Sequence, residues 1–597
     1  MKRSATLHPI FTTTRTQLTR KAALGVTLLS ALSFCTGCNQ EDSMDAYDAT
    51  GAVYYDQSQE VNPYHPQEGA AEDRQVASVD PITGQVEITY NAEENASLDN
   101  QLTFAVDVDT ASYTIARSHL ENGMLPPKET VRVEEFINFF DYADDAPEDL
   151  SASPFSVHLD AAKAPFAENK TLLRIGLKGY EVPDVERPAT NLVFLIDTSG
   201  SMGSSIDLVR QSLGLLLDHL NQTDTIAIVT YAGSSGVALQ PTPVSQRQVI
   251  LNSMNRLSTG GGTHGASGIL TAYELAEEAF QQGGLNRVVL CTDGDFNIGA
   301  RGDTLDTLIE EKRESGITLS VLGFGGRYND HQMERLADLG NGNYSFIDSL
   351  REAQRALVDR LTATLMVIAK DVKVQLELNP MIVKTYRLLG YENRAIADED
   401  FRNDSVDAGE IGAGHGVTAL VELDLYPEGE RPSADELNLS VVGSGEANPD
   451  LEPEIEENSE TEVEVEVDSE AEVEADPNTQ VVTSLEIDPV FFQEGAPLAL
   501  LRLRNKAPDA SAEDSAVEQV HVIHESDIRQ DAKRASKQLM FAAAVAEFAE
   551  ILRESPYVAQ TDFDAIIDLA ERGMTPGDEW MAEFIDLVEM AKEIYNR

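Results

Sequence analysis

The feature that most constrains the fold is a regular alternation of short apolar runs with amphipathic segments across residues 190–368. Segments such as 206–220 and 269–280 repeat their apolar residues with the period of an α-helix. Buried strands that alternate with amphipathic helices form a parallel sheet covered on both faces. We therefore predict a doubly wound, Rossmann-like α/β domain over residues 190–368. Its strands are expected at residues 192–196, 226–231, 288–291, 319–324 and 344–347, and its last helix at 350–368.

Strand-like alternation of apolar and polar residues flanks this domain on both sides. It occurs at residues 172–177 before the domain and at 372–378 after it. The simplest architecture is a β-rich domain into which the α/β domain is inserted, with strands supplied from both flanks. We predict a multidomain chain, whose other parts are an N-terminal module at 101–185, a β-rich C-terminal domain at 371–510 and a C-terminal helical unit at 527–597.

The charge of the chain excludes one large class of partner. Its 597 residues include 44 Lys and Arg against 103 Asp and Glu, which gives a net charge of −59. Proteins bind nucleic acids largely through Lys and Arg, and a surface this negative repels phosphates. We therefore exclude nucleic acids as partners, and also a basic patch that would bind anionic lipids.

The acidic residues are concentrated in residues 446–476, which contain fifteen acidic side chains and no basic one. Part of this stretch alternates Glu with Val, as a strand would, but like charges along one face would repel each other. We predict a disordered insert in the β-rich domain. A cation-binding acidic segment is the alternative.

Residues 1–38 resemble the signal peptide of a bacterial lipoprotein. A basic stretch without acidic residues precedes an apolar run at 22–34, which is too short to span a bilayer. The small residue Gly37 precedes Cys38, as is usual where the cysteine is acylated and becomes the mature N-terminus. We predict that a lipid on Cys38 anchors the protein to a membrane of the bacterial cell envelope. By the same resemblance, Asn39 favours the outer membrane; secretion without a lipid is the alternative.

Residues 39–100 contain fourteen acidic residues and one basic residue. Such a composition buries little apolar surface. We predict a disordered acidic tether that holds the folded part of the chain away from the bilayer.

Polar side chains lie where strands of the predicted parallel sheet end. Asp197, Ser199 and Ser201 follow the first strand, and Asp293 follows the third. A glycine-rich segment between these strands supplies Thr263. Ligands of open α/β sheets bind at the carboxyl ends of the strands, so we expect these side chains to converge. We expect both carboxylates to lie on exposed loop ends.

All five candidate ligands are oxygen donors. Such a set suits Mg²⁺, with Mn²⁺ and Ca²⁺ as alternatives. So few protein oxygens leave a coordination position open. We therefore predict a protein partner that presents an acidic residue to the metal.

The pattern Asp197-x-Ser199-x-Ser201, with Thr263 and Thr292-Asp293-Gly294 downstream, resembles a known motif. It is similar to the metal-ion-dependent adhesion site (MIDAS) of the von Willebrand factor type A (VWA) domain. The resemblance covers residues 190–368 and implies that the two serines and the threonine contact the ion, with the aspartates acting directly or through water. It also implies metal-dependent protein–protein interaction.

The flanks carry a second resemblance. Several segments look like parts of the bacterial YfbK-type VWA lipoproteins, which have no established activity to transfer. The resemblance therefore implies the fold and the ion, but not the partner. These segments are residues 104–113, 131–138, 391–394, 407–415 and 541–548.

Two other functions remain open on the sequence. A metal-dependent hydrolase would use the ion to activate water, but it needs a general base, and His264 is the histidine nearest the motif. A structural scaffold of the envelope would bind partners without a metal. We predict a protein that is not an enzyme and has no catalytic residue. Asp107 and Asp109 are expected to cap the helix that starts at Thr110, with cation binding by this pair as the alternative.

Overall fold

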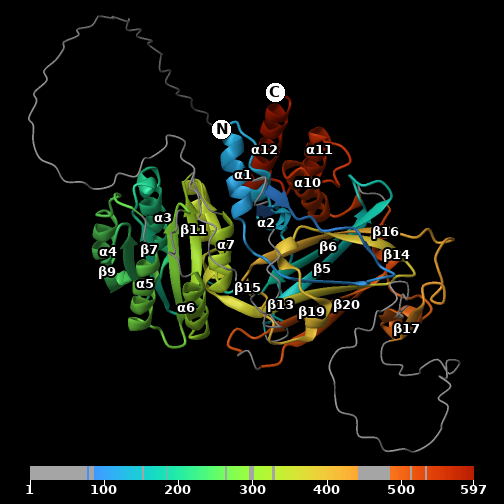
Figure 1. Ribbon diagram of the computed structural model, residues 1–597, viewed down its shortest axis with the longest axis horizontal. Helices are drawn as coiled ribbons and strands as arrows, with labels where there is room; N and C mark the ends of the chain where they lie inside the picture. Colours follow the sequence, from blue (N-terminus) through green and yellow to red (C-terminus); the bar gives the residue numbers. More distant parts are fainter. Residues whose placement is uncertain are drawn as a thin grey trace, which may run out of the picture. The chain divides into compact units, whose positions relative to one another are not determined.

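The computed structural model describes most of the chain from residue 86 onward (Figure 1). The described residues are 77–79, 86–150, 153–183, 186–262, 265–294, 302–325, 330–441, 485–510, 514–530 and 534–597. The predicted signal peptide with Cys38, and the predicted acidic insert at 446–476, lie outside them. Among the described helices, none is both long enough and apolar enough to cross a membrane.

The α/β domain contains a six-stranded sheet in the order β12-β11-β10-β7-β8-β9. Its strands pair in parallel, except that β9 pairs antiparallel with β8 at one edge. Every residue of β7 is buried, as expected where helices cover both faces. The predicted doubly wound fold is therefore confirmed. The strands are β7 (Thr190–Asp197), β8 (Thr225–Tyr231), β9 (Ser235–Pro243), β10 (Leu285–Thr292), β11 (Thr318–Phe324) and β12 (Tyr344–Ile347).

Helices on the two faces of this sheet close two separate apolar cores. One core takes side chains from α3 and α4, and the other from α5, α6 and α7. The helices are α3 (Ile206–His219), α4 (Arg247–Met254), α5 (Ala266–Glu278), α6 (Gly302–Glu314) and α7 (Asp330–Leu339).

The single long helix predicted at residues 350–368 is wrong. The chain instead forms α8 (Leu350–Gln354), a π-helical turn (Arg355–Asp359) and α9 (Leu361–Leu365). Strand β13 (Val367–Leu378) follows directly and pairs with strands of the β-rich domain. The helix therefore ends early because its last predicted turn is recruited into that sheet.

The β-rich domain contains two sheets that share one apolar core, which includes Leu173 from one sheet and Leu376 from the other. Both sheets combine strands from before and after the α/β domain, which confirms the predicted insertion. The first sheet contains β4 (Gln101–Ala105), β13, β15 (Gly409–Gly412), β19 (Ala499–Lys506) and β20 (Val517–Ile523). The second runs β21 (Ile528–Arg529), β5 (Phe155–Lys163), β6 (Lys170–Gly179), β16 (Gly416–Leu425), β14 (Val383–Leu389) and β3 (Glu94–Asn95). Two small sheets pair β1 (Ala77–Val79) with β2 (Val86–Ile88), and β17 (Leu439–Val441) with β18 (Leu485–Ile487).

The predicted tether extends too far toward the C-terminus. Tyr90 donates a hydrogen bond to the carbonyl of Arg553 at 2.8 Å, and Asn91 donates one to the carbonyl of Gly390 at 2.6 Å. Ala96 is fully buried. Residues 90–100 therefore belong to the folded part, because their backbone and polar side chains bond to distant segments that composition does not reveal.

The C-terminal helical unit includes helices from the other end of the described chain. Helices α10 (Lys537–Leu552), α11 (Phe563–Gly573) and α12 (Glu579–Tyr595) share one core with α1 (Ala111–Glu121) and α2 (Val133–Asn138) (Figure 1). Phe140 lies edge-on to Phe541 and to Phe584, at centroid distances of 5.0 and 5.7 Å. Most of α10 is buried, as expected for a helix that is apolar on all sides. The N-terminal module and the helical unit, predicted as separate, are thus packed together here.

Candidate metal centre

The first loop of the candidate site follows β7. Asp197 ends the strand, and its Oδ1 accepts a hydrogen bond from the backbone N–H of Ser199 at 2.7 Å. The hydroxyls of Ser199 and Ser201 lie 2.9 Å apart. Three of the predicted oxygen donors therefore lie within one tight turn.

The second loop follows β10, the strand next to β7 in the sheet. Ile196 and Cys291 are register partners, so Asp197 and Thr292 lie side by side. The Thr292 hydroxyl donates a hydrogen bond to Asp197 Oδ2 at 3.4 Å and accepts one from the N–H of Gly294 at 3.2 Å. The parallel register thus brings the two motif loops together, as the sequence predicted.

The glycine-rich segment lies against the first loop. The N–H of Gly260 donates to the carbonyl of Thr198 at 2.8 Å, and the N–H of Gly200 donates to the carbonyl of Gly261 at 3.3 Å. Gly261 has φ 94°, a backbone conformation that favours glycine. Thr263 and His264 lie outside the described residues, so the role of Thr263 as a ligand stays a prediction.

Both candidate carboxylates are buried, which corrects the expectation of exposed loop ends. Asp197 is 0% exposed and Asp293 is 3% exposed, whereas Ser201 is exposed. Strands β7 and β10 end below the protein surface. The carboxylates at their ends therefore lie at the bottom of the site. Asp293 Oδ1 has no hydrogen-bond partner among the described residues. A buried carboxylate oxygen without a partner is costly, and it is a position that a cation would satisfy.

The shift in the pKa of Asp197 also favours a bound cation. Its pKa is raised, first by burial and then further by the neighbouring Asp293 carboxylate. Hydrogen bonds from Ser199 and Tyr231 partly offset this rise. None of the largest contributions to this shift comes from a Lys or Arg side chain. Among the described residues, the two like charges are therefore held together without an ion pair to a Lys or Arg, which favours a bound cation.

The donor set fits a hard divalent ion. Two carboxylates and the serine hydroxyls are the oxygen ligands that Mg²⁺-class ions prefer. Among the described residues, no three carboxylate, imidazole or thiolate side chains come together in a way that could hold a metal ion. A metal ion at this site would therefore be held by two carboxylates together with hydroxyl oxygens.

Tyr231 is a site residue that the motif does not reveal. It ends β8 and is the register partner of Asp197. The N–H and the hydroxyl of Thr198 both donate to its carbonyl, at 2.8 and 3.0 Å. The sequence feature that could have identified Tyr231 is its position at the carboxyl end of the strand next to the motif strand. Cys291, in contrast, is fully buried, and burial raises the pKa of its thiol, so it packs as an apolar residue.

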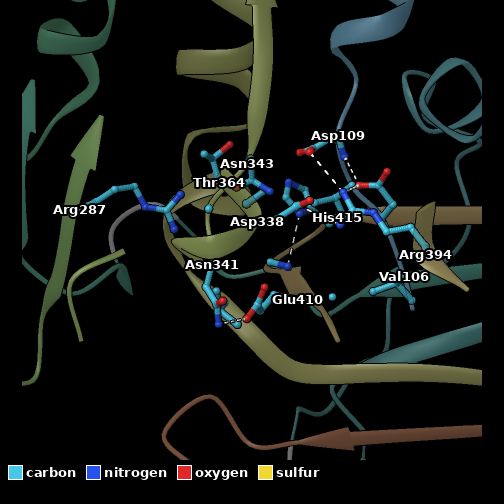
Figure 2. Close-up of a pocket in the computed structure, with 17 residues that line it drawn as sticks. Val106, Asp109, Arg287, Asp338, Asn341, Asn343, Thr364, Arg394, Glu410 and His415 are labelled. Carbon is cyan, nitrogen blue, oxygen red and sulfur yellow. Dashed lines mark hydrogen bonds and ion pairs between the residues drawn. The ribbon is translucent and has the colours of Figure 1, made fainter. Parts of the chain in front are cut away.

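A second polar centre lies where α7 meets the β-rich domain, around a cavity of about 40 Å³. Figure 2 shows Asp109, Asp338 and Arg394 beside this cavity. The Arg394 guanidinium lies 2.9 Å from Asp338 Oδ1, 3.5 Å from Asp107 Oδ1 and 3.8 Å from Asp109 Oδ2. Asp109 also accepts a hydrogen bond from the N–H of Tyr344 at 2.9 Å. The predicted capping role of Asp107 and Asp109 is wrong, because neither side chain caps α1 and both face Arg394 instead.

Comparisons with known proteins identify several matches. A family model described as von Willebrand factor type A domain matches residues 191–360, and one described as von Willebrand factor matches residues 86–174. A third, described as "Uncharacterized protein YfbK, C-terminal", matches residues 363–448 and 463–594. The uncharacterized protein YfbK of Escherichia coli (strain K12) is 37% identical over 499 residues, which are 82% of this chain and 77% of that protein.

More distant relatives cover less of the chain. The magnesium-chelatase 67 kDa subunit of Chlorobaculum tepidum is 27% identical over 229 residues, which are 34% of this chain and 36% of that protein. A solved structure described as von Willebrand factor type A from Catenulispora acidiphila covers 75% of this chain and 91% of its own, with 12% identity and a TM-score of 0.39.

Proposed function

Because the chain belongs to the YfbK family of von Willebrand factor type A proteins, we propose that it binds a protein partner through a divalent cation. The ion would be Mg²⁺, with Mn²⁺ or Ca²⁺ as alternatives, held by Asp197, Ser199, Ser201, Asp293 and Thr263. Bound there, it would supply a concentrated positive charge on a chain whose net charge is −59. An acidic residue of the partner is the group that this charge would attract.

The observation that carries this proposal is the state of the two carboxylates. Asp197 and Asp293 are buried side by side, neither has a basic partner among the described ion pairs, and Asp293 Oδ1 has no described hydrogen-bond partner. Buried charges are normally paired or ligate metals. The two carboxylates therefore form the buried, negatively charged bottom of the site, and the exposed Ser201 lies on the side that a partner can reach.

The same proposal includes the location of the protein. A lipid on Cys38 would anchor the mature chain in the bacterial cell envelope, where an outer-membrane position follows from Asn39. The support is the sequence of residues 1–38. A Cys38→Ala variant expressed in the native host should lack the mass of the lipid. It should also no longer be recovered in the membrane fraction. Equal membrane partition by wild type and variant would contradict the anchor.

The partner is tested by a pull-down from the native envelope with the full-length protein as bait. Mg²⁺ should support capture of a partner, and EDTA should abolish it. An Asp293→Asn bait should fail in both conditions, whereas the exposed-site control Asp568→Asn on α11 should behave as wild type. Capture that is equal with EDTA, or with the Asp293→Asn bait, would show that the protein binds through another surface and would support the structural scaffold.

A further inference from the structure

Helix α7 of the VWA domain packs against the N-terminal module and the β-rich domain through charged side chains. On this side it carries three carboxyls, from Asp330, Glu334 and Asp338. Two arginines from outside the VWA domain contact them: Arg132, which directly precedes α2, and Arg394, which follows β14. Each arginine contacts two of the three carboxyls. The two guanidiniums therefore tie α7 to the rest of the chain, and we call this contact the α7 interface.

Three more carboxyls lie on the other side of the same guanidiniums. Glu135 contacts Arg132, and Asp107 and Asp109 lie 3.5 and 3.8 Å from Arg394. Figure 2 shows Asp109 and Arg394 together beside the small cavity. Among the described ion pairs, none of the six carboxyls contacts another basic side chain. Full ionisation would therefore leave a large excess of negative charge at the interface, which is costly away from water.

Water reaches little of the α7 interface. Five of the six carboxyls are at most 8% exposed, and the exception is Asp338, whose side chain is 37% exposed at the edge. Asp107 Oδ2 has no hydrogen-bond partner among the described residues. Glu135 Oε2 accepts a hydrogen bond from the N–H of Ser112 at 2.8 Å, but this donor carries no charge. The excess carboxyls are therefore accommodated best when they are protonated.

The pKa values of four of these carboxyls are raised, as protonation requires. Burial is the largest cause at each, neighbouring carboxyls add to the rise, and the two arginines partly offset it. The pKa of Glu135 reaches about 7. Tyr344 faces Asp330, and burial followed by this carboxyl raises the pKa of its phenol, so it adds no positive charge. The four carboxyls are Asp109, Glu135, Glu334 and Asp338.

From this geometry we propose that the α7 interface is a proton-dependent latch, which holds α7 while some of its carboxyls are protonated and loosens when they ionise. Loosening exposes the carboxyls to water, where the pKa of a Glu is about 4.5. Opening therefore releases protons, and it becomes more favourable as the pH rises from about 4.5 toward the higher pKa of the closed latch. The latch goes beyond the metal-dependent function and does not rest on it.

Hydrogen–deuterium exchange on the full-length protein, with EDTA present, tests the latch. Peptides from α7 report its opening, and peptides from α11 are an internal reference for global unfolding. After correction for the intrinsic pH dependence of amide exchange, the protection of wild-type α7 should fall between pH 5 and pH 7. Glu135 alone should contribute about a hundredfold, because each proton released changes the opening constant about tenfold per pH unit. The fall should be larger in α7 than in α11.

Replacement of a latch carboxyl by its amide should keep the latch closed. Glu135→Gln resembles the protonated carboxyl and keeps the acceptor for Ser112. At pH 7, its α7 protection should exceed that of wild type by about tenfold or more. The control Glu274→Gln changes an exposed carboxyl on α5 and should follow wild type. If circular dichroism shows that Glu135→Gln is misfolded, Glu334→Gln provides the same test from α7 itself, with the same expected gain.

Three results would overturn the latch. The first is α7 protection in wild type that does not change between pH 5 and pH 7. The second is an equal change in α7 and α11, which would mean that ionisation destabilises the whole fold rather than releasing α7. The third is a pH profile of the folded Gln variant that equals that of wild type.

Discussion

Replacement of Glu134 by Gln should change how stability depends on pH, because Glu134 is a fully buried carboxyl that forms no ion pair with a basic side chain among the described residues. It lies on α2, and its Oε2 accepts a hydrogen bond from the N–H of Tyr391 at 2.9 Å. Its Oε1 has no partner among the described residues. Burial, and then Glu392 and Asp107, raise its pKa from 4.5 to about 8. The folded state therefore retains a proton that the unfolded chain releases above pH 4.5.

The sign and size of the change in unfolding free energy with pH follow from this pKa shift. Between pH 4.5 and pH 8 the folded state binds more protons than the unfolded state, so the free energy of unfolding falls as the pH rises. Each pH unit costs about 1.4 kcal/mol, so the loss between pH 5 and pH 8 is about 4 kcal/mol. Glu134→Gln keeps the acceptor for Tyr391 and cannot ionise. The variant should therefore gain about 4 kcal/mol relative to wild type over this range.

Urea unfolding followed by tryptophan fluorescence measures this difference. Trp580 is the only tryptophan of the chain, and it packs against the same helical core as α2. The control Glu571→Gln changes an exposed residue on α11 and should follow the wild-type pH profile. Parallel pH profiles for Glu134→Gln and wild type would refute the assignment of a protonated Glu134 in the folded protein.

Three further substitutions test the packing. Arg394→Met leaves the buried carboxylates Asp107 and Asp109 without their cation and should cost about 3–5 kcal/mol in urea unfolding; a loss below about 1 kcal/mol would contradict the ion cluster. Gly390→Ala should destabilise by about 2 kcal/mol or more, because φ is 78° and the new Cβ would meet Glu134 Oε2 at 2.4 Å; wild-type stability would exclude this backbone conformation. Phe541→Ala should cost about 3–5 kcal/mol, and a melting temperature equal to that of wild type would mean that α10 is not packed on α2.

The sequence reveals the VWA sheet because its strands are continuous apolar runs that end in the ligand motif, as at β7 and Asp197. The two motif loops are also predictable, since parallel strands align their carboxyl ends. The burial of Asp293 is not predictable from the sequence, because it depends on how far the loop that carries Asp293 lies beneath the neighbouring loops.

Long-range packing is the part that the sequence did not yield. Residues of β3 at 94–95 look like solvated chain, yet they pair with β14 near residue 385. Phe136 and Phe548 lie far apart in the sequence and 6.4 Å apart between ring centroids. Arg394 was visible only as part of a family-like segment, and its partners Asp107 and Asp338 come from two other segments. Amphipathic patterns show that such faces are buried, but not against which partner.

The central claim is tested most directly by calorimetric titration of Mg²⁺ and Mn²⁺ into the full-length protein after removal of metal with EDTA. We predict one saturable site in wild type, lost in Asp197→Asn and Asp293→Asn, and weakened less in Ser199→Ala because a neutral hydroxyl holds a divalent ion less strongly than a carboxylate. Asp568→Asn, which removes an exposed carboxylate on α11, should bind as wild type. Absence of binding by wild type, or unchanged binding by Asp293→Asn, would contradict a metal centre at these loops.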